Sequence, residues 1–268
     1  SPTLESEIRK GAILSGGAMF SLIRRNTPHV KFDSEDNIKD FDFYFHNMDS
    51  LTYVVNTLLA SFKPKPDSEK FYNEIAPLKI APNGLGVDIE QLKNGGYLIG
   101  TYGLNAQIEL IITNNAITLK QKNSPWGDVQ IIMIVCKPNP DDITKEFDFV
   151  HCQSYLRLDN GEVKVPAECY NSIISKKLIF KGGMNPLSAI VRMHKFQSRN
   201  WHLSRPQMYK LIAYASKVID FTNMEQVKKL MLGFYMEKGY PEIQTMPMDK
   251  LKSLEDFMDW LDELTYKY

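Results

Sequence analysis

The pattern of hydrophobic and polar residues changes midway along this chain of 268 residues. Between Lys10 and about Arg157, short apolar or alternating segments are mixed with segments of helical periodicity. From Pro166 onwards, apolar residues recur almost entirely at helical spacing. The change predicts an α+β protein whose first lobe, residues 1–160, has a mixed sheet with flanking helices, followed by a mostly helical lobe, residues 161–268.

One predicted strand, Asp40–His46, separates acidic from aromatic side chains. Asp40 and Asp42 point to one side and three phenylalanines to the other, because successive side chains of a strand alternate. We expect the phenylalanine side in the core. The same alternation predicts a second acidic strand, Phe147–Val150, which places Asp148 opposite two phenylalanines. Further strands are predicted at Gly11–Ser15, Gln107–Thr113, Ala116–Gln121 and Val129–Val135, the middle two as a hairpin across Asn114 and Asn115.

Helical periodicity occurs in both lobes. Helices are predicted at Ala18–Arg25, Leu51–Phe62, Ala167–Lys177, Pro186–Arg199, Arg205–Ile219, Met224–Glu237 and Leu251–Leu264. Prolines and glycines in Pro64–Pro66 and Pro82–Gly86 predict a loop-rich insertion, to which the sequence assigns no function.

Composition excludes several classes of protein. Lys+Arg and Asp+Glu balance at 32 each, which argues against a globally basic nucleic-acid coat and leaves only local basic patches. The longest apolar run, Ile131–Cys136, is too short to span a membrane, and the acidic first residues do not resemble a secretory signal, so we expect a cytoplasmic protein. The spacing of the three cysteines and five histidines fits neither a disulfide framework nor a zinc site, so we expect no zinc.

The strongest chemical signal is the Asp40-x-Asp42 pair. Two carboxylates at i and i+2 of a strand lie on one face, about 6–7 Å apart at Cβ, a span that oxygen ligands close around hard cations such as Mg²⁺. Two-metal phosphoryl transfer uses acidic ligands shared between ions about 3.5–4 Å apart, so a third carboxylate is expected on a neighbouring strand, and Asp148 fits. The alternative is that these aspartates form only the solvated faces of two strands.

The order of these features resembles the DNA polymerase β-like nucleotidyltransferase superfamily. A strand, then Ser15-Gly16-Gly17 opening a helix, an Asp-x-Asp strand and a late third Asp follow one another between Ile13 and about Cys152. The sequence Ser-Gly-Gly-Ala-Met-Phe-Ser-Leu is similar to the Gly-Gly branch, which includes tRNA nucleotidyltransferases and abortive-infection or toxin nucleotidyltransferases. The interval from Gly17 to Asp40 is longer than is usual in that branch, so we expect an inserted segment before the metal strand.

The resemblance implies a set of binding residues. Mg²⁺ or Mn²⁺ would be held by Asp40, Asp42 and Asp148, and a nucleoside triphosphate would meet the backbone of Gly16 and Gly17, with a hydroxyl contact from Ser15. A basic stripe at i, i+3 and i+7 of the helix after Pro186 would bind the triphosphate tail, although the same stripe also fits a solvated charged face. The stripe consists of Arg192, Lys195 and Arg199.

The implied reaction is the transfer of a nucleoside monophosphate from the triphosphate to an acceptor hydroxyl. RNA is the acceptor by family analogy, with a tRNA 3′ end as one candidate. Two alternatives stay open: modification of a protein hydroxyl, as in AMPylation, and a non-catalytic nucleotide- or RNA-binding module of the same fold. His46, on the face of the aspartates, and Trp201 and His202, beside the basic stripe, are additional candidates for substrate contact, with structural roles as the alternative.

Overall fold

The computed structural model describes most of the chain. The described residues are 2–61, 63–64, 79–81, 84–86, 98–101, 108–112, 116–121, 127–183, 185–232 and 249–265. The predicted turn at Asn114 and Asn115 and most of the predicted loop-rich insertion lie outside them. In the described part of the chain, no helix has the length and apolar character needed to cross a membrane.

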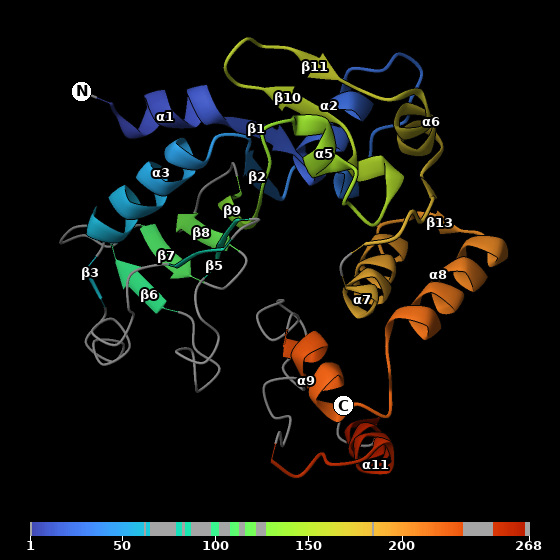
Figure 1. Cartoon of the computed structure of the whole chain (residues 1–268). Coiled ribbons are helices and arrows are strands. Elements are labelled where there is room, and N and C mark those ends of the chain that lie inside the picture. The colour runs from blue at the N-terminus through green and yellow to red at the C-terminus, as the bar shows by residue number, and fades with distance from the viewer. Residues whose placement is uncertain are drawn as a thin grey trace.

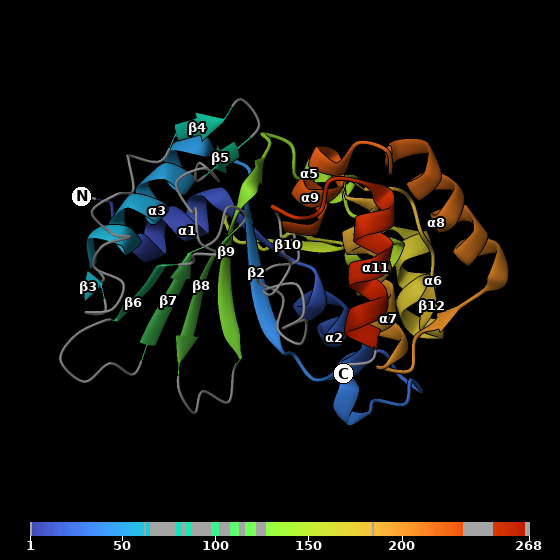
Figure 2. The same ribbon diagram turned by 90° about the horizontal axis from the view of Figure 1, so that it is seen from below.

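A mixed sheet forms the frame of the first half of the protein (Figures 1 and 2). Among the described residues it has nine strands in the order β11-β10-β1-β2-β9-β8-β7-β6-β3, and all neighbours are antiparallel except β2 and β9. The strands are β1 (Ala12–Ser15), β2 (Asp40–Phe45), β3 (Lys63–Pro64), β6 (Leu98–Thr101), β7 (Ile108–Ile112), β8 (Ala116–Gln121), β9 (Asp128–Cys136), β10 (Tyr155–Arg157) and β11 (Val163–Lys164).

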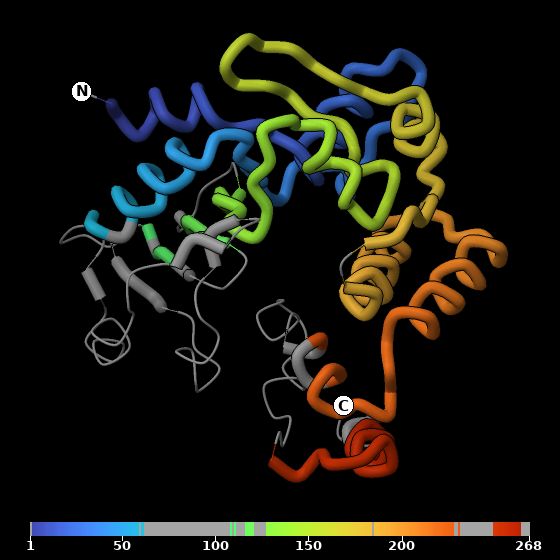
Figure 3. Tube along the Cα trace, in the orientation of Figure 1, coloured from blue at the N-terminus to red at the C-terminus, as the bar shows by residue number. Residues whose placement is uncertain are grey.

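Helices cover the sheet and make up most of the second half (Figures 1 and 2), and Figure 3 follows the path of the chain from its N-terminus to its C-terminus. They are α1 (Leu4–Gly11), α2 (Gly17–Arg25), α3 (Met48–Ser61), α5 (Pro140–Thr144), α6 (Ala167–Ser175), α7 (Pro186–Gln197), α8 (Arg205–Val218), α9 (Met224–Leu232) and α11 (Leu254–Thr265). Two small ladders, β4 (Lys79–Ala81) with β5 (Gly84–Gly86) and β12 (Lys177–Leu178) with β13 (His202–Leu203), are the other described strands. The α+β class and the helical second half are as predicted.

Local sequence explains where the helices near the site begin. The Asn185 side chain accepts hydrogen bonds from the backbone N–H groups of Leu187 and Ser188, and Pro186, which has no N–H to satisfy, occupies the first turn of α7. Asn139 and Pro140 repeat this arrangement at α5. Helix α2 has no side-chain cap: Gly16 precedes it with a φ of 71°.

Two cores flank the site. The first joins α3 to the sheet through Leu51, Val54 and Ile131, among others. The second joins Phe20 of α2 to Phe149, Phe196 and other buried residues that come mainly from α6, α7 and α8. Because α2 belongs to the first predicted lobe, the boundary near residue 160 crosses a shared core, and the division into two lobes stays a prediction.

The predicted strand around Asp148 is wrong. Asp148 lies in a bend, Phe149 forms a single bridge to Phe180, and Val150–Cys152 is a turn of 3-10 helix. The alternation of Phe147 to Val150 therefore reflects burial of individual side chains, because β10 takes the place beside β1. The other predicted strands and helices are found within a few residues of their expected bounds, and α9 is described only as far as Leu232.

Candidate active site

Sheet register places the two aspartates of β2 on one face with polar neighbours. Asp42 pairs with Ser15 of β1 and with Gln130 of β9, and Asp40 pairs with Asp128 of β9. Residues paired across a sheet point to the same side, so Asp128 shares the face of Asp40 and Asp42. The opposite face carries phenylalanines that pack in the core, as the sequence predicts.

The diglycine turn lies directly against these carboxylates. A Cβ atom at Gly16 would lie 2.8 Å from Oδ2 of Asp42, and one at Gly17 would lie 3.3 Å from Oδ1 of Asp40. The φ of Gly16, 71°, also disfavours any residue with a side chain. The first turn of α2 therefore begins beside both aspartates, where its unpaired backbone N–H groups form an anion-binding end.

Ser15 anchors this turn. Its side chain is buried, and its hydroxyl donates a hydrogen bond of 2.7 Å to the carbonyl oxygen of Ser154, with the carbonyl of Cys152 at 3.2 Å. The hydroxyl therefore fastens the end of β1 to the segment before β10. The glycines therefore approach the carboxylates closely, whereas the Ser15 hydroxyl is engaged by two carbonyl groups.

The pKa of Asp42 reflects its burial and two neighbouring charges. Burial, and after it the neighbouring charge of Asp40, raise the pKa of Asp42 to about 7, while the positive charge of Lys195 opposes both. Two close carboxylates in a poorly solvated position repel each other unless a cation lies between them. Their oxygen atoms are the ligands that Mg²⁺ and Mn²⁺ prefer, so the pair fits a divalent metal ion.

Asp148 is bound to Arg192 of α7. Nε of Arg192 donates a hydrogen bond of 2.7 Å to Oδ2 of Asp148, whose side chain is 9% exposed, against 39% for Arg192. Lys195, one turn further along α7, acts on Asp42, so the two basic residues of this stripe serve different carboxylates. Arg199 follows the end of α7 and is half-buried. Among the described residues, no three His, Cys, Asp or Glu side chains are grouped to hold a metal ion.

Tyr44 links the two carboxylate positions. It follows Asp42 on the same face of β2, and its ring lies 4.9 Å from that of Phe147, beside Asp148. Burial raises its pKa well above the ordinary value, and the charges of Asp42 and, more weakly, Asp148 add to this. Tyr44 therefore lies within electrostatic range of both aspartates. The alternation of β2 predicted its face, but only the fold brings it close to Asp148.

The other candidates for substrate contact have structural surroundings. Trp201 is 4% exposed and packs against His151 and Phe196, so it belongs to the second core. His46 lies beyond the end of β2 near Arg157, and burial lowers its pKa. His202 is exposed in β13.

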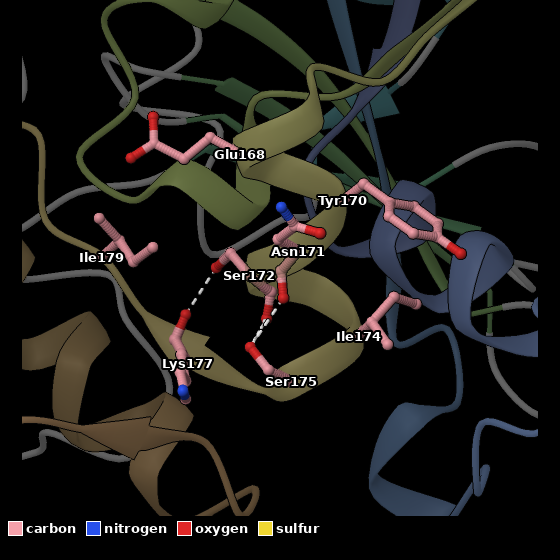
Figure 4. A pocket seen from close by; sticks show the side chains of 8 residues that line it. All are labelled: Glu168, Tyr170, Asn171, Ser172, Ile174, Ser175, Lys177 and Ile179. Atoms are coloured by element: carbon pink, nitrogen blue, oxygen red, sulfur yellow. Dashed lines mark hydrogen bonds between the residues drawn. The ribbon is translucent and has the colours of Figure 1, made fainter.

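A shallow pocket of about 670 Å³ lies on α6 and β12 (Figure 4). Ser172 and Ser175 line it and bond to nearby carbonyl groups, and Lys177 lies at its side. Its lining includes none of the predicted site residues. The pocket is therefore separate from the carboxylate face.

Comparison with known proteins places the chain in a family. The family model described as Gad2, Gabija anti-defense 2 family protein, matches residues 3–176. The chain belongs to the Gad2 family. The match includes the diglycine turn, Asp40, Asp42 and Asp148, whereas α7, with its basic stripe, lies beyond it. Among curated proteins, none matches this Gad2 family member.

Several solved structures share a distant likeness with this Gad2 protein. "Structure of tRNA-processing enzyme with CTP" has 10% identity and a TM-score of 0.37, covering 89% of this chain and 54% of that one. The Thermotoga maritima CCA-adding enzyme complexed with tRNA has 10% identity and a TM-score of 0.40, covering 89% and 46%. The Bacillus stearothermophilus CCA-adding enzyme in complex with CTP has 11% identity and a TM-score of 0.35, covering 82% and 44%. The chain spans about half the length of these proteins, and at such scores the likeness says nothing about the site.

Proposed function

We propose that this Gad2 protein is a metal-dependent nucleotidyltransferase that transfers a nucleoside monophosphate from a triphosphate to an acceptor hydroxyl. The hydroxyl oxygen would bond to the α-phosphorus as the bond to the β-phosphate breaks, and pyrophosphate would leave. One observation carries the proposal: the glycines that open α2 lie 2.8 Å and 3.3 Å, measured from their would-be Cβ atoms, from the carboxylates of Asp42 and Asp40. An anion-binding helix end and a cation-binding acidic pair at one place suit a nucleotide with its metal ion. Either feature alone would suit many other ligands.

Each group of residues at the candidate site would have its own role in the transfer reaction. The N–H groups at the start of α2 would bind phosphate oxygens, and Asp40 and Asp42 would hold Mg²⁺ or Mn²⁺. The bound ion would lower the pKa of the acceptor hydroxyl and neutralise charge on the phosphates. Lys195 and Arg192, with Arg199 further out, would bind the triphosphate tail. Asp148, once Arg192 binds phosphate instead, would be free to take the proton of the acceptor hydroxyl or to hold metal.

Asp128 is a second candidate for the third carboxylate. Its register opposite Asp40 gives it the place on a neighbouring strand that phosphoryl-transfer chemistry requires. Asp148 is held by Arg192 but remains our first assignment, because Tyr44 and Cys152 each lie within electrostatic range of both Asp42 and Asp148. Comparison of Asp128→Asn with Asp148→Asn decides between them: the variant of the true third carboxylate loses transfer activity, and the other retains most of it.

RNA is the acceptor that the charge distribution supports best. The net charge of the chain is zero, but between Pro166 and Ile219 there are nine Lys or Arg residues and one Glu. This segment contains the basic stripe of α7, and a local excess of positive charge would attract a polyanionic acceptor. Lys176, Lys181 and Arg192 are paired with acidic residues, so the other basic residues of the segment would carry most of this attraction. The family description adds a biological setting, in which the transfer would act against Gabija defence.

The test is direct transfer of label. The protein is incubated with each α-³²P-labelled nucleoside triphosphate, Mg²⁺ or Mn²⁺, and either total RNA or purified Gabija proteins. We expect label on RNA, and its loss in Asp42→Asn. The matched control is Asp49→Asn, which removes an exposed carboxylate of α3 with the same change of charge.

Each outcome has a definite meaning. Label on a Gabija protein instead of RNA would retain the transferase and overturn the RNA acceptor. Absence of label from every acceptor, with both metal ions and all four nucleotides, would overturn the proposed activity. Equal transfer by Asp42→Asn and Asp49→Asn would remove the acidic pair from the mechanism.

A further inference from the structure

The segment Phe180–Gly183 lies directly against Asp148. The backbone N–H of Lys181 donates a hydrogen bond of 2.8 Å to the carbonyl oxygen of Asp148, and Phe180 bridges to Phe149. A Cβ atom at Gly183 would lie 3.1 Å from Cβ of Asp148. The path of this segment therefore determines where the backbone of Asp148 lies.

Helix α8 holds the same segment from its other side. The Gln207 side chain accepts a hydrogen bond of 2.8 Å from the N–H of Phe180, and Nζ of Lys210 donates one of 2.7 Å to the carbonyl oxygen of Phe180. The hydroxyl of Tyr214 donates one of 2.8 Å to the carbonyl oxygen of Gly183. These three side chains are spaced i, i+3 and i+7, so they line one face of α8.

The segment depends on such outside contacts because it contains two glycines with unusual backbone angles. Gly182 and Gly183 have φ of 132° and 143°, a region that residues with side chains rarely adopt. Neither glycine has a side chain with which to pack, and glycine has the greatest backbone freedom to lose on folding. The ring of Tyr214 packs against Gly182 as well, at 3.8 Å from the would-be Cβ atom.

We infer that α8 sets the position of Asp148 through this segment, and that Tyr214 is a positioning residue for the proposed transfer reaction. The effect of Tyr214 on catalysis rests on the proposed function, but the positioning of Asp148 by α8 does not. Figures 1 and 2 show α8 at the outer side of the helical half, away from the sheet, so an outer helix helps to organise the carboxylate face. Gly182 and Gly183 therefore help to position Asp148, whereas their sequence alone indicates only a turn.

Tyr214→Phe tests the inference, because it removes one hydroxyl and retains the ring that packs on Phe180. The control is Tyr209→Phe on the same helix, where the tyrosine is 62% exposed. We expect Tyr214→Phe to lower kcat about 10- to 100-fold and to raise the Mg²⁺ concentration needed for half-maximal rate, with an unchanged KM for the nucleotide. If Tyr214→Phe only reduced the amount of folded protein, the apparent kcat would fall but the Mg²⁺ concentration needed for half-maximal rate would not change.

A second measurement does not depend on activity. Hydrogen exchange of the Lys181 amide, which bonds to Asp148, is expected to accelerate about fivefold or more in Tyr214→Phe and to stay unchanged in Tyr209→Phe. Unchanged exchange in Tyr214→Phe would overturn the inference. If the wild type transfers no nucleotide, the proposed function fails and hydrogen exchange alone decides whether α8 positions Asp148. If the wild type is active and both variants match it, the positioning role is overturned.

Discussion

His151 is predicted to make the protein acid-labile. The side chain is fully buried, its ring lies 4.2 Å from that of Trp201 and 4.4 Å from that of Phe196, and burial lowers its pKa to about 3. Among the described residues neither ring nitrogen has a hydrogen-bond partner. A protonated imidazole in this aromatic cluster would be a buried charge without a counter-ion, so the folded protein keeps His151 neutral.

The size of the effect follows from the difference between two pKa values. In the unfolded chain His151 titrates near its ordinary pKa of 6.5, whereas in the folded protein it titrates near 3. Between these values the unfolded chain binds the extra proton, so the free energy of unfolding is fully retained above about pH 6.5 and falls as the pH falls. At about pH 4.5 the loss is roughly 2.5 kcal/mol, from about 1.36 kcal/mol for each unit below 6.5.

Urea denaturation followed by tryptophan fluorescence measures this loss, at about pH 7.5 and about pH 4.5. The comparison is with His151→Leu, a residue of similar size that cannot titrate. We expect the variant to be within about 1.5 kcal/mol of the wild type at the higher pH, because no hydrogen bond is lost. At the lower pH it should gain about 2.5 kcal/mol relative to the wild type. Carboxylates titrate equally in both proteins and cancel, so an equal acid-induced loss in both would refute the reasoning.

Two further predictions concern a buried ion pair and the diglycine turn. In the wild type, Nε of the buried Arg24 lies 3.0 Å from Oδ2 of Asp36. Asp36→Asn should lower the free energy of unfolding by about 3–5 kcal/mol in urea denaturation, because it leaves Arg24 without its counter-charge. An unchanged urea midpoint would contradict this. Gly16→Ala should abolish label transfer, because its methyl group would displace the Asp42 carboxylate, and should cost about 1–3 kcal/mol of stability. Gly161→Ala, with a φ of 76° and open space around it, isolates the backbone strain and should retain activity.

Periodicity predicted most of the fold because its evidence is local. The alternation of β2 placed its aspartates and phenylalanines on the correct faces, and the apolar spacing of the later helices gave α6 to α8 within two residues. The prediction of a strand around Asp148 was wrong for the same reason. A four-residue alternation contains no information about its pairing partner, and the partner, Phe180, comes from beyond the predicted lobe boundary.

The arrangement of the residues at the candidate site was predicted in part, while their roles stay predictions. Gly16, Gly17, Asp40 and Asp42 lie together as the sequence order indicated. Asp128 was missed although it directly precedes a predicted strand, because its place opposite Asp40 comes from the parallel register of β9 beside β2, which joins residues far apart in the chain. The hydroxyl of Tyr214 gave no sequence signal at all, since a tyrosine on an amphipathic helix is ordinary.

Asp148 and the acidic pair of β2 interact with different basic residues of α7. Burial and the charge of Asp40 raise the pKa of Asp42 to about 7 against the opposing charge of Lys195, so a third carboxylate held beside them without a cation would add to the repulsion. Arg192 instead neutralises Asp148 at 2.7 Å on the same helix whose Lys195 acts on Asp42. Under the proposed function, a triphosphate with its metal ion supplies positive charge to the carboxylates and a competing anion to Arg192 in one step. The acidic cluster would therefore be complete only when the nucleotide is bound, and α8, which holds the backbone of Asp148, keeps that residue in place while its side chain changes partner.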